Sequence, residues 1–129
     1  MKFAPVFHDK AYVSPSSTAK GGTVNMADCI FNSRAICSDY VINTSSMIKH
    51  EMDYDRVRIT PNVCIGRDAM IKPCPAVLLN SNVIQNINVD SHSFIDAKSI
   101  AIKDIPTNAI SVTVPSTILR SRSEGEAYL

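Results

Sequence analysis

The sequence predicts an all-β fold, a single-stranded parallel β-helix built from hexapeptide repeats. Three observations predict it: 26 of the 129 residues are Val or Ile, only 6% are aromatic with no Trp, and a β-branched residue recurs at every sixth position. β-Branched side chains favour strands, but a helix repeats at three to four residues and an ordinary strand at two. A period of six fits short strands and corners that wind into three-sided coils stacked about 4.8 Å apart. Such a thin prism holds aliphatic side chains better than Trp.

The six-residue repeat runs from Val24 to Ala101, with one five-residue step between Tyr54 and Ile59. Each repeated side chain is predicted to point inward. A β-sandwich of short strands is the alternative, but it needs turn signals at about 8–12-residue spacing, and the chain has only four Gly. Twelve of the 14 repeat positions are Val or Ile: Val24, Ile30, Ile36, Ile42, Ile48, Tyr54, Ile59, Ile65, Ile71, Val77, Val83, Val89, Ile95 and Ala101.

One domain is expected over residues 1–129, a length that can bury its own core. Residues 1–23 are expected as a lead-in, residues 24–106 as fewer than five coils, and residues 107–129 as a C-terminal cap and tail. The apolar stretch Ile110 to Val114 should cap the last coil or cross to a neighbouring chain.

Charge and composition exclude several classes of protein. A net charge of +1 gives no electrostatic case for nucleic-acid binding. No apolar run approaches the ~18–20 residues of a membrane span, and no apolar signal-peptide core follows the N-terminus. Four cysteines without a CxxC pair favour free thiols in a reducing compartment. The expectation is a soluble, cytoplasmic protein that binds neither nucleic acid nor membrane.

Among the three histidines, His50 has the most suggestive neighbours. His8, His50 and His92 lack metal-ligand spacing, so a β-helix zinc enzyme of the carbonic-anhydrase type lacks support and no metal site is expected. His50 follows the inward Ile48 by two places, which puts it at an outer corner beside Glu51. A general base and a solvated surface histidine both remain open from these residues, whereas His8 and His92 are expected to be structural. Residues about 18 apart should stack in one column: Asn32, His50, Arg67, Gln85 and Lys103.

Two segments resemble a known family. GGTVNMADCIF…ICSDYVINTSSMIKHE, from Gly21 to Glu51, and AIKDIPTNAISVTVPSTILR, from Ala101 to Arg120, are similar to the left-handed β-helix sugar acetyltransferases. The similarity is strongest to the sialic acid O-acetyltransferases and the UDP-amino-sugar N-acetyltransferases, and it spans roughly residues 7–120. It implies a left-handed homotrimer with acetyl-CoA in the groove between subunits. Phe31, Ile84 and Ile102 should form an exposed apolar column on one outer face, which suggests a partner.

The resemblance also implies roles for particular residues. The residue matching His50 is the general base, the one matching Glu51 orients its imidazole, and the one matching Asn43, next to Thr44, places the acceptor. Acetyl-CoA would donate the acetyl group to a hydroxyl, or to an amine, of a sugar or nucleotide sugar. The hydroxyl is favoured. The expected donor-binding positions are Arg58, Gly66, Arg67, Ala97 and Lys98.

Several of these positions depart from the family pattern. Arg58 replaces a histidine near the thioester, Arg67 replaces a glycine that meets the pantetheine arm, and Ile95 to Ser99 lacks glycine. The basic replacements either obstruct the donor or grip its phosphates. The resemblance starts where the N-terminal nucleotide-sugar domain of many relatives would end, so a nucleotide-sugar acceptor is less expected than a free sugar. The alternative function is therefore an inactive β-helix that serves as a scaffold or binding protein.

Overall fold

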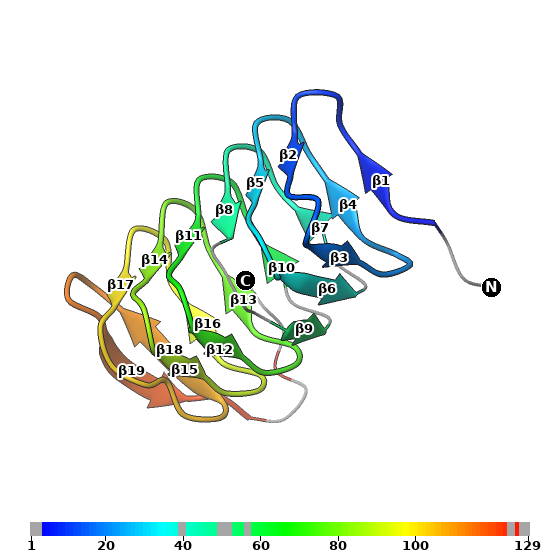
Figure 1. Cartoon of the computed structure of the whole chain (residues 1–129). Coiled ribbons are helices and arrows are strands. Elements are labelled where there is room, and N and C mark those ends of the chain that lie inside the picture. The colour runs from blue at the N-terminus through cyan, green and yellow to red at the C-terminus, as the bar shows by residue number, and fades with distance from the viewer. Residues whose placement is uncertain (1–3, 39–40, 49–52, 56–57, 124–125, 127–129) are drawn as a thin grey trace.

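The computed structural model describes residues 4–38, 41–48, 53–55, 58–123 and 126. The chain winds as a stack of three-sided coils, with the N-terminal coil at one end and the β18–β19 hairpin at the other (Figure 1). All regular elements among the described residues are β-strands. None of these residues forms a helix long and apolar enough to cross a membrane. The predicted all-β parallel coil is therefore confirmed.

The strands form three faces, because each coil contributes one short strand to each face. The first is an eight-stranded sheet of β1 (Val6–Phe7), β4 (Val24–Asn25), β7 (Val41–Ile42), β10 (Arg58–Ile59), β13 (Ala76–Val77), β16 (Phe94–Ile95), β18 (Ala109–Val112) and β19 (Thr117–Ser121). The second contains β2 (Tyr12–Val13), β5 (Ile30–Phe31), β8 (Met47–Ile48), β11 (Cys64–Ile65), β14 (Asn82–Val83) and β17 (Ile100–Ala101). The third contains β3 (Thr18–Ala19), β6 (Ile36–Ser38) and β9 (Asp53–Asp55), followed by β12 (Met70–Ile71) and β15 (Asn88–Val89).

From β7 onward the interior of the prism is a stack of aliphatic side chains contributed by successive strands whose side chains are described. From residue 42 onward the predicted inward positions are confirmed in every case where the side chain is described. The core residues are Ile42, Ile48, Ile59, Ile65, Ile71, Val77, Val83, Val89, Ile95 and Ala101. Burial of these side chains supplies the main favourable term for folding.

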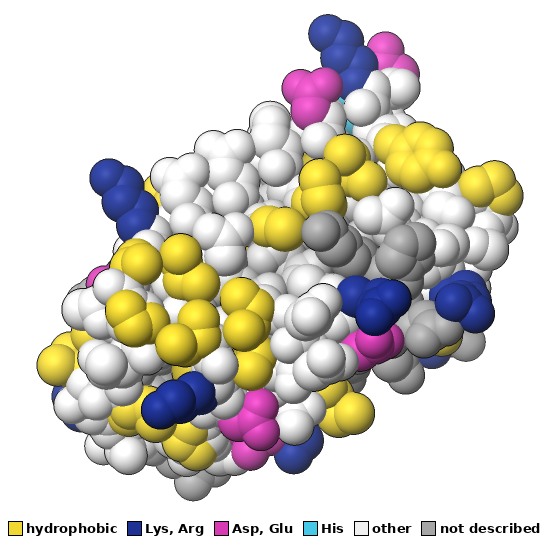
Figure 2. Space-filling view, turned by 60° about the vertical axis from the view of Figure 1, so that its left-hand side comes forward, with side chains coloured by type: hydrophobic (Ala, Val, Ile, Leu, Met, Phe, Trp, Pro, Cys, Tyr) yellow, Lys and Arg dark blue, Asp and Glu magenta, His cyan; other side chains and the backbone are white. Residues whose placement is uncertain are grey.

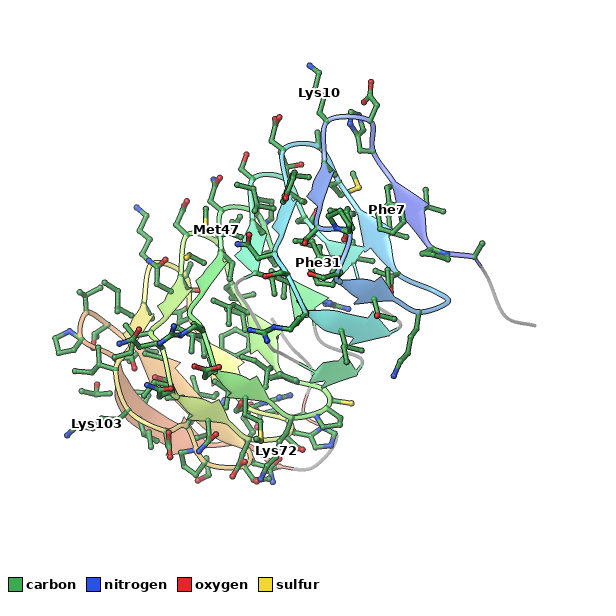
Figure 3. The ribbon with its side chains drawn as sticks, in the orientation of Figure 1. Phe7, Lys10, Phe31, Met47, Lys72 and Lys103 are labelled. Carbon is green, nitrogen blue, oxygen red and sulfur yellow. The ribbon has the colours of Figure 1, made fainter. Side chains whose placement is uncertain are left out.

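Before residue 42 the predicted inward positions are wrong by one residue, so the phase of the repeat is shifted there. Val24 pairs with Val41 and Ile30 with Met47, so both lie at outer positions. The inward residues are Asn25, 1% exposed, and Phe31, 0% exposed. Phe31 lies inside the stack (Figure 3) and therefore does not belong to the predicted outer apolar column. The error arose because Val24, Ile30 and Ile36 are β-branched and lie directly before the true inward positions.

Two successive coils are one residue short. Phe31 pairs with Ile48 and Ile48 with Ile65, both 17 residues apart, whereas Ile65 pairs with Val83, 18 residues apart. The step between β9 and β10 was predicted. An equal step between β6 and β7 was missed, because the wrong phase before residue 42 concealed it.

Residues with left-handed backbone turn the corners. The N–H groups of Ser45, Asn62, Asn80 and Lys98 each donate to a carbonyl of the preceding coil, at 2.8–3.2 Å. Asn and Asp tolerate this conformation better than most residues, which explains how the chain turns with few glycines. The residues with positive φ at the corners are Gly22, Asp28, Arg34, Ser45, Asn62, Asp68, Cys74, Asn80, Asn86, His92, Lys98 and Asn108.

The coil region begins earlier in the sequence than predicted, and a hairpin follows it. Coils begin at Val6 rather than at Val24, because β1, β2 and β3 pair in parallel with β4, β5 and β6. The expected lead-in over residues 1–23 therefore contains a complete coil, in which Val13 and Ala19 pack against the core while Phe7, paired in register with the inward Asn25, is 42% exposed at the end of the stack. At the other end, Ile110 pairs with Phe94 and the β18–β19 hairpin extends the first face. The predicted cap over residues 107–129 stays a prediction.

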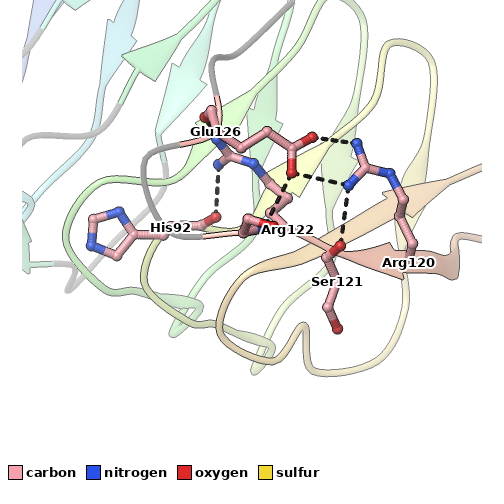
Figure 4. A network of polar contacts seen from close by, with 6 residues as sticks. His92, Arg120, Ser121, Arg122 and Glu126 are labelled. Carbon is pink, nitrogen blue, oxygen red and sulfur yellow. Dashed lines mark hydrogen bonds and ion pairs between the residues drawn. The ribbon is translucent and has the colours of Figure 1, made fainter.

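The C-terminal tail is held by a polar network (Figure 4). Arg122 donates from Nη1 to the carbonyl of His92 at 2.9 Å, and Arg120 forms an ion pair with Glu126. The hydrogen bond from Arg120 holds the pKa of Glu126 at about 2, well below its ordinary value. The Glu126 carboxyl therefore stays ionised and paired with Arg120 of β19 until the pH falls below the ordinary range of a carboxyl.

Asn25 is a buried amide residue at an inward position of the core. Its side chain is inward, between Phe7 and Ile42 in the register, and neither Nδ2 nor Oδ1 has a hydrogen-bond partner among the described residues. A buried amide without a partner costs free energy that an apolar side chain of similar size does not.

Asn25→Val should therefore raise the free energy of unfolding by about 1–2 kcal/mol, measured by urea denaturation. Asn88→Val is the control, because the exposed amide of Asn88 already bonds Asp104 and its loss should not stabilise the fold. A destabilised Asn25→Val variant would contradict this account of Asn25.

Candidate functional site

A groove of about 740 Å³ opens over the second face and the corner that follows it. It extends from the coil that contains β5 to the coil that contains β14. Its described lining residues supply three amides, one guanidinium, one thiol and apolar side chains, and hence several hydrogen-bonding groups and one charged group. The lining residues are Asn32, Cys64, Gly66, Arg67, Asn82, Val83, Ile84 and Gln85.

Arg67 supplies that charge. It follows the inward Ile65 by two positions, and its side chain is 62% exposed. Its Nε lies 3.2 Å from Oδ2 of Asp68, and its carbonyl accepts from the N–H of Asn86 at 3.0 Å. The backbone and one side of the guanidinium are thus held in place.

The predicted column is confirmed in part. Strand register places Arg67, Gln85 and Lys103 one above another, each two positions after an inward residue. Asn32 directly follows the inward Phe31, so it lies one place away from this column, and its predicted membership is wrong. The shifted phase before residue 42 caused this error as well.

Gly66 has a packing role that the sequence did not reveal. A Cβ at this position would lie 2.5 Å from the backbone nitrogen of Gln85 and 2.7 Å from the carbonyl carbon of Ile84. Two coils approach here more closely than a side chain allows. Gly66 therefore lets the coils stack beneath the groove, and a predicted contact with a donor is not needed to explain it.

The predicted catalytic pair, His50 and Glu51, lies outside the described residues. In the second face β8 lies between β5 and β11. The corners after β5 and β11 contribute Asn32 and Arg67 to the groove, and His50 follows β8 by two residues in the sequence.

Asn43 and Thr44 lie at a different edge, the corner between the first and second faces. Nδ2 of Asn43 donates to the carbonyl of Ile59 at 3.2 Å, and the carbonyl of Thr44 accepts from the N–H of Asn62 at 3.1 Å. The Cys29 thiol donates to the carbonyl of Asn43 at 3.0 Å, and burial raises the pKa of this thiol. These contacts tie the corner to its neighbouring coils.

The five predicted donor-binding residues do not form one cluster on a single chain. Arg58 is exposed on the first face, Ala97 and Lys98 lie at the corner between the first and second faces, and Gly66 and Arg67 line the groove. The corner at Lys98 turns without glycine, because Lys98 itself adopts left-handed backbone.

A second groove, of about 620 Å³, lies over the third face. In it Lys72 pairs with Asp90 at 2.7 Å, and the Asp104 carboxylate accepts a hydrogen bond from the N–H of Asn88 at 2.8 Å. Its lining residues are Met70, Lys72, Asn88, Asp90, Asp104, Ile105, Pro106 and Ile118.

Metal-binding clusters are not found among the described residues: they contain no group of three or more His, Cys, Asp or Glu placed to hold an ion. Cys29, Cys64 and Cys74 are free thiols.

Sequence reasoning missed Cys64 and Asn82 as lining residues. Both directly precede an inward residue, so their side chains lie on the outer side of the second face. The repeat could have identified them, because every residue at this position of a hexapeptide faces outward on its strand.

No protein-family model matches the sequence, and no curated protein matches it. Several solved structures are similar to this chain. The acetyltransferase domain of PglB from Neisseria gonorrhoeae FA1090, in complex with acetyl coenzyme A, superposes with a TM-score of 0.87 at 23% identity, over 92% of this chain and 58% of that one. PerB from Caulobacter crescentus, in complex with CoA and GDP-perosamine, superposes with a TM-score of 0.69 at 21% identity, over 91% and 57%.

A third similar structure is AntD, an N-acyltransferase from Bacillus cereus in complex with dTDP and 3-hydroxybutyryl-CoA. Its TM-score is 0.77 at 14% identity, over 92% of this chain and 80% of AntD. The chain thus spans somewhat more than half the length of the PglB and PerB chains. These similarities confirm the resemblance at the level of the fold: the chain is a left-handed parallel β-helix of hexapeptide repeats.

Gly66→Ala should lower the free energy of unfolding by about 1–3 kcal/mol, because the added methyl group forces two stacked coils apart. Gly21→Ala is the control, since Gly21 is not in left-handed backbone. Urea denaturation of both variants measures the difference. Equal stabilities of the two variants would show that the coils beneath the groove do not need a glycine.

Proposed function

We propose that the chain is an acyl-CoA-dependent acyltransferase that moves an acetyl group onto a hydroxyl or amine of a sugar. The single observation that carries this proposal is the groove whose lining residues lie on the corners either side of β8, the strand that His50 follows. The similar structures add support, because they are named as acetyl- or acyltransferases or hold CoA, acyl-CoA or nucleotide sugars.

In this mechanism His50 is the general base and Glu51 orients its imidazole. The acceptor hydroxyl or amine attacks the thioester carbonyl carbon while His50 takes its proton. The tetrahedral intermediate then expels the CoA sulfur, which leaves as the thiol after receiving that proton. No covalent enzyme intermediate is needed, and the products are the acetylated sugar and free CoA. Backbone N–H groups at the corners would stabilise the oxyanion.

Asn43 and Thr44 are proposed to place the acceptor, and Arg58, Gly66, Ala97 and Lys98 to contact the donor, while Arg67 can bind a phosphate of the donor or a carboxylate of the acceptor. Because these residues lie on different edges of one chain, the proposal includes a site shared between subunits of a homotrimer. Exposed Ile84 and Ile102, 40% and 39% accessible, supply apolar surface for such an interface. Figure 2 shows hydrophobic side chains gathered on the lower left of the molecule, the end that carries the last coils. Sedimentation of the purified chain tests the trimer, and a monomer would contradict a shared site.

The second candidate is a β-helix that binds partners without catalysis. The packing role of Gly66 and the hydrogen bond from Asn43 to Ile59 favour it, because both give structural explanations for predicted site residues. Calorimetry with CoA discriminates between the two candidates. Micromolar binding supports the enzyme, whereas the absence of binding heat supports the scaffold.

The decisive assay follows CoA thiol release from acetyl-CoA with a panel of neutral, acidic and amino sugars. His50→Asn should lower the rate about 10²- to 10⁴-fold, the usual contribution of a general base. Product analysis then separates hydroxyl from amine acceptors. The sequence favours a hydroxyl, while AntD is an N-acyltransferase by name.

His92→Asn is the matched control for this assay. His92 has left-handed backbone, which Asn also tolerates, and its contact with Arg122 uses the main-chain carbonyl. Its rate should equal that of the unaltered chain. Thiol release that is equally fast in the His50→Asn variant would remove His50 from the mechanism.

A further inference from the structure

Arg67 is a cation placed in the groove with unused hydrogen-bonding capacity. It is the one charged side chain among the described residues that line the groove. Its Nε is engaged by Asp68 at 3.2 Å, but its two Nη groups have no partner among the described residues. Arginine presents these groups as a planar fork that matches two oxygens of a carboxylate or phosphate.

The surroundings of Arg67 fix the position of this fork. Asp68 adopts left-handed backbone, which turns the chain immediately after Arg67. The Arg67 carbonyl accepts from Asn86, and Gly66 beside it packs against the backbone of the next coil. A cation whose backbone and Nε are already held loses less conformational freedom when a ligand binds than a free surface lysine would.

The remaining lining suits a polyhydroxylated ligand. Asn32, Asn82 and Gln85 each carry a side-chain amide with a donor and an acceptor, and none of the three bonds another described side chain. Gln85 stacks directly on Arg67 in the same column. Amides around one arginine can bind hydroxyl groups on either side of a single anionic group.

We infer that Arg67 is a specificity-determining residue that binds one oxyanion of the ligand in this groove. The inference rests on the proposed function for the identity of the ligands. Two sources carry that chemistry: a carboxylate on an acidic sugar acceptor, and a phosphate of the acyl-CoA donor. Among the described lining residues one arginine lies among neutral amides, a set that matches a monoanion better than the several charges of CoA, so the acidic sugar is the expected source.

Two sets of calorimetric binding titrations, a sugar arm and a donor arm, test this inference without turnover. The sugar arm compares N-acetylneuraminate and glucuronate with their methyl esters, which lack the charge but keep the shape. The donor arm compares acetyl-CoA with S-acetylpantetheine, which lacks the nucleotide phosphates. One of the acids should bind the unaltered chain on the order of tenfold or more tightly than its ester.

Arg67→Met should abolish that preference, and Arg67→Lys should retain only part of it because the fork is lost. Lys10→Met is the control: Lys10 lies in the N-terminal coil (Figure 3), outside the groove lining, and the variant should leave the preference unchanged. A selective loss of acetyl-CoA affinity in Arg67→Met would keep the oxyanion site and assign it to the donor.

The inference is overturned if Arg67→Met changes neither the affinity for the sugars nor the affinity for acetyl-CoA. It is also overturned if the unaltered chain binds acids and esters equally and Arg67→Met leaves its affinity for acetyl-CoA unchanged. Failure of the proposed function gives a different result. The chain would then bind an acid selectively but release no thiol from acetyl-CoA.

Discussion

The structure depends on the burial of one inward side chain from each short strand. Strands of two to five residues cannot hold together alone, so each coil is stable only because its inward residues pack on those of the coils above and below. β-Branched residues suit this stack because their restricted rotamers lose little freedom on burial. The same stacking fixes the height of every corner, and hence which corner residues line the groove.

Corner geometry then decides which residues are free for chemistry. Left-handed residues such as Asn62 and Lys98 commit their N–H groups to the preceding coil. Gly66 is committed to packing, and Asn43 bonds the carbonyl of Ile59. Arg67 keeps two unpaired Nη groups within the described part of the chain. The groove therefore combines a rigid wall with one available cation, an arrangement suited to ordering a ligand before it reacts.

The repeat alone predicted the parallel coil, the inward residues from Ile42 onward and the column of Arg67, Gln85 and Lys103. It could not set the phase before residue 42, because Val24 and Ile30 are as apolar as inward residues, while the true inward residue Asn25 is polar. Small buried residues two positions before each inward one, such as Thr23 and Cys29, carry the correct phase. The packing of Gly66 was not predictable, since it depends on the closeness of two coils. The roles of His50 and Glu51 come from the resemblance, and they remain proposals.

The most direct measurement is a crystal structure of the chain soaked with acetyl-CoA. The account predicts that the donor lies along the groove between Asn32 and Arg67, with its thioester within hydrogen-bonding reach of the imidazole of His50. Donor density over another face, or an imidazole of His50 packed inside the prism, would contradict it.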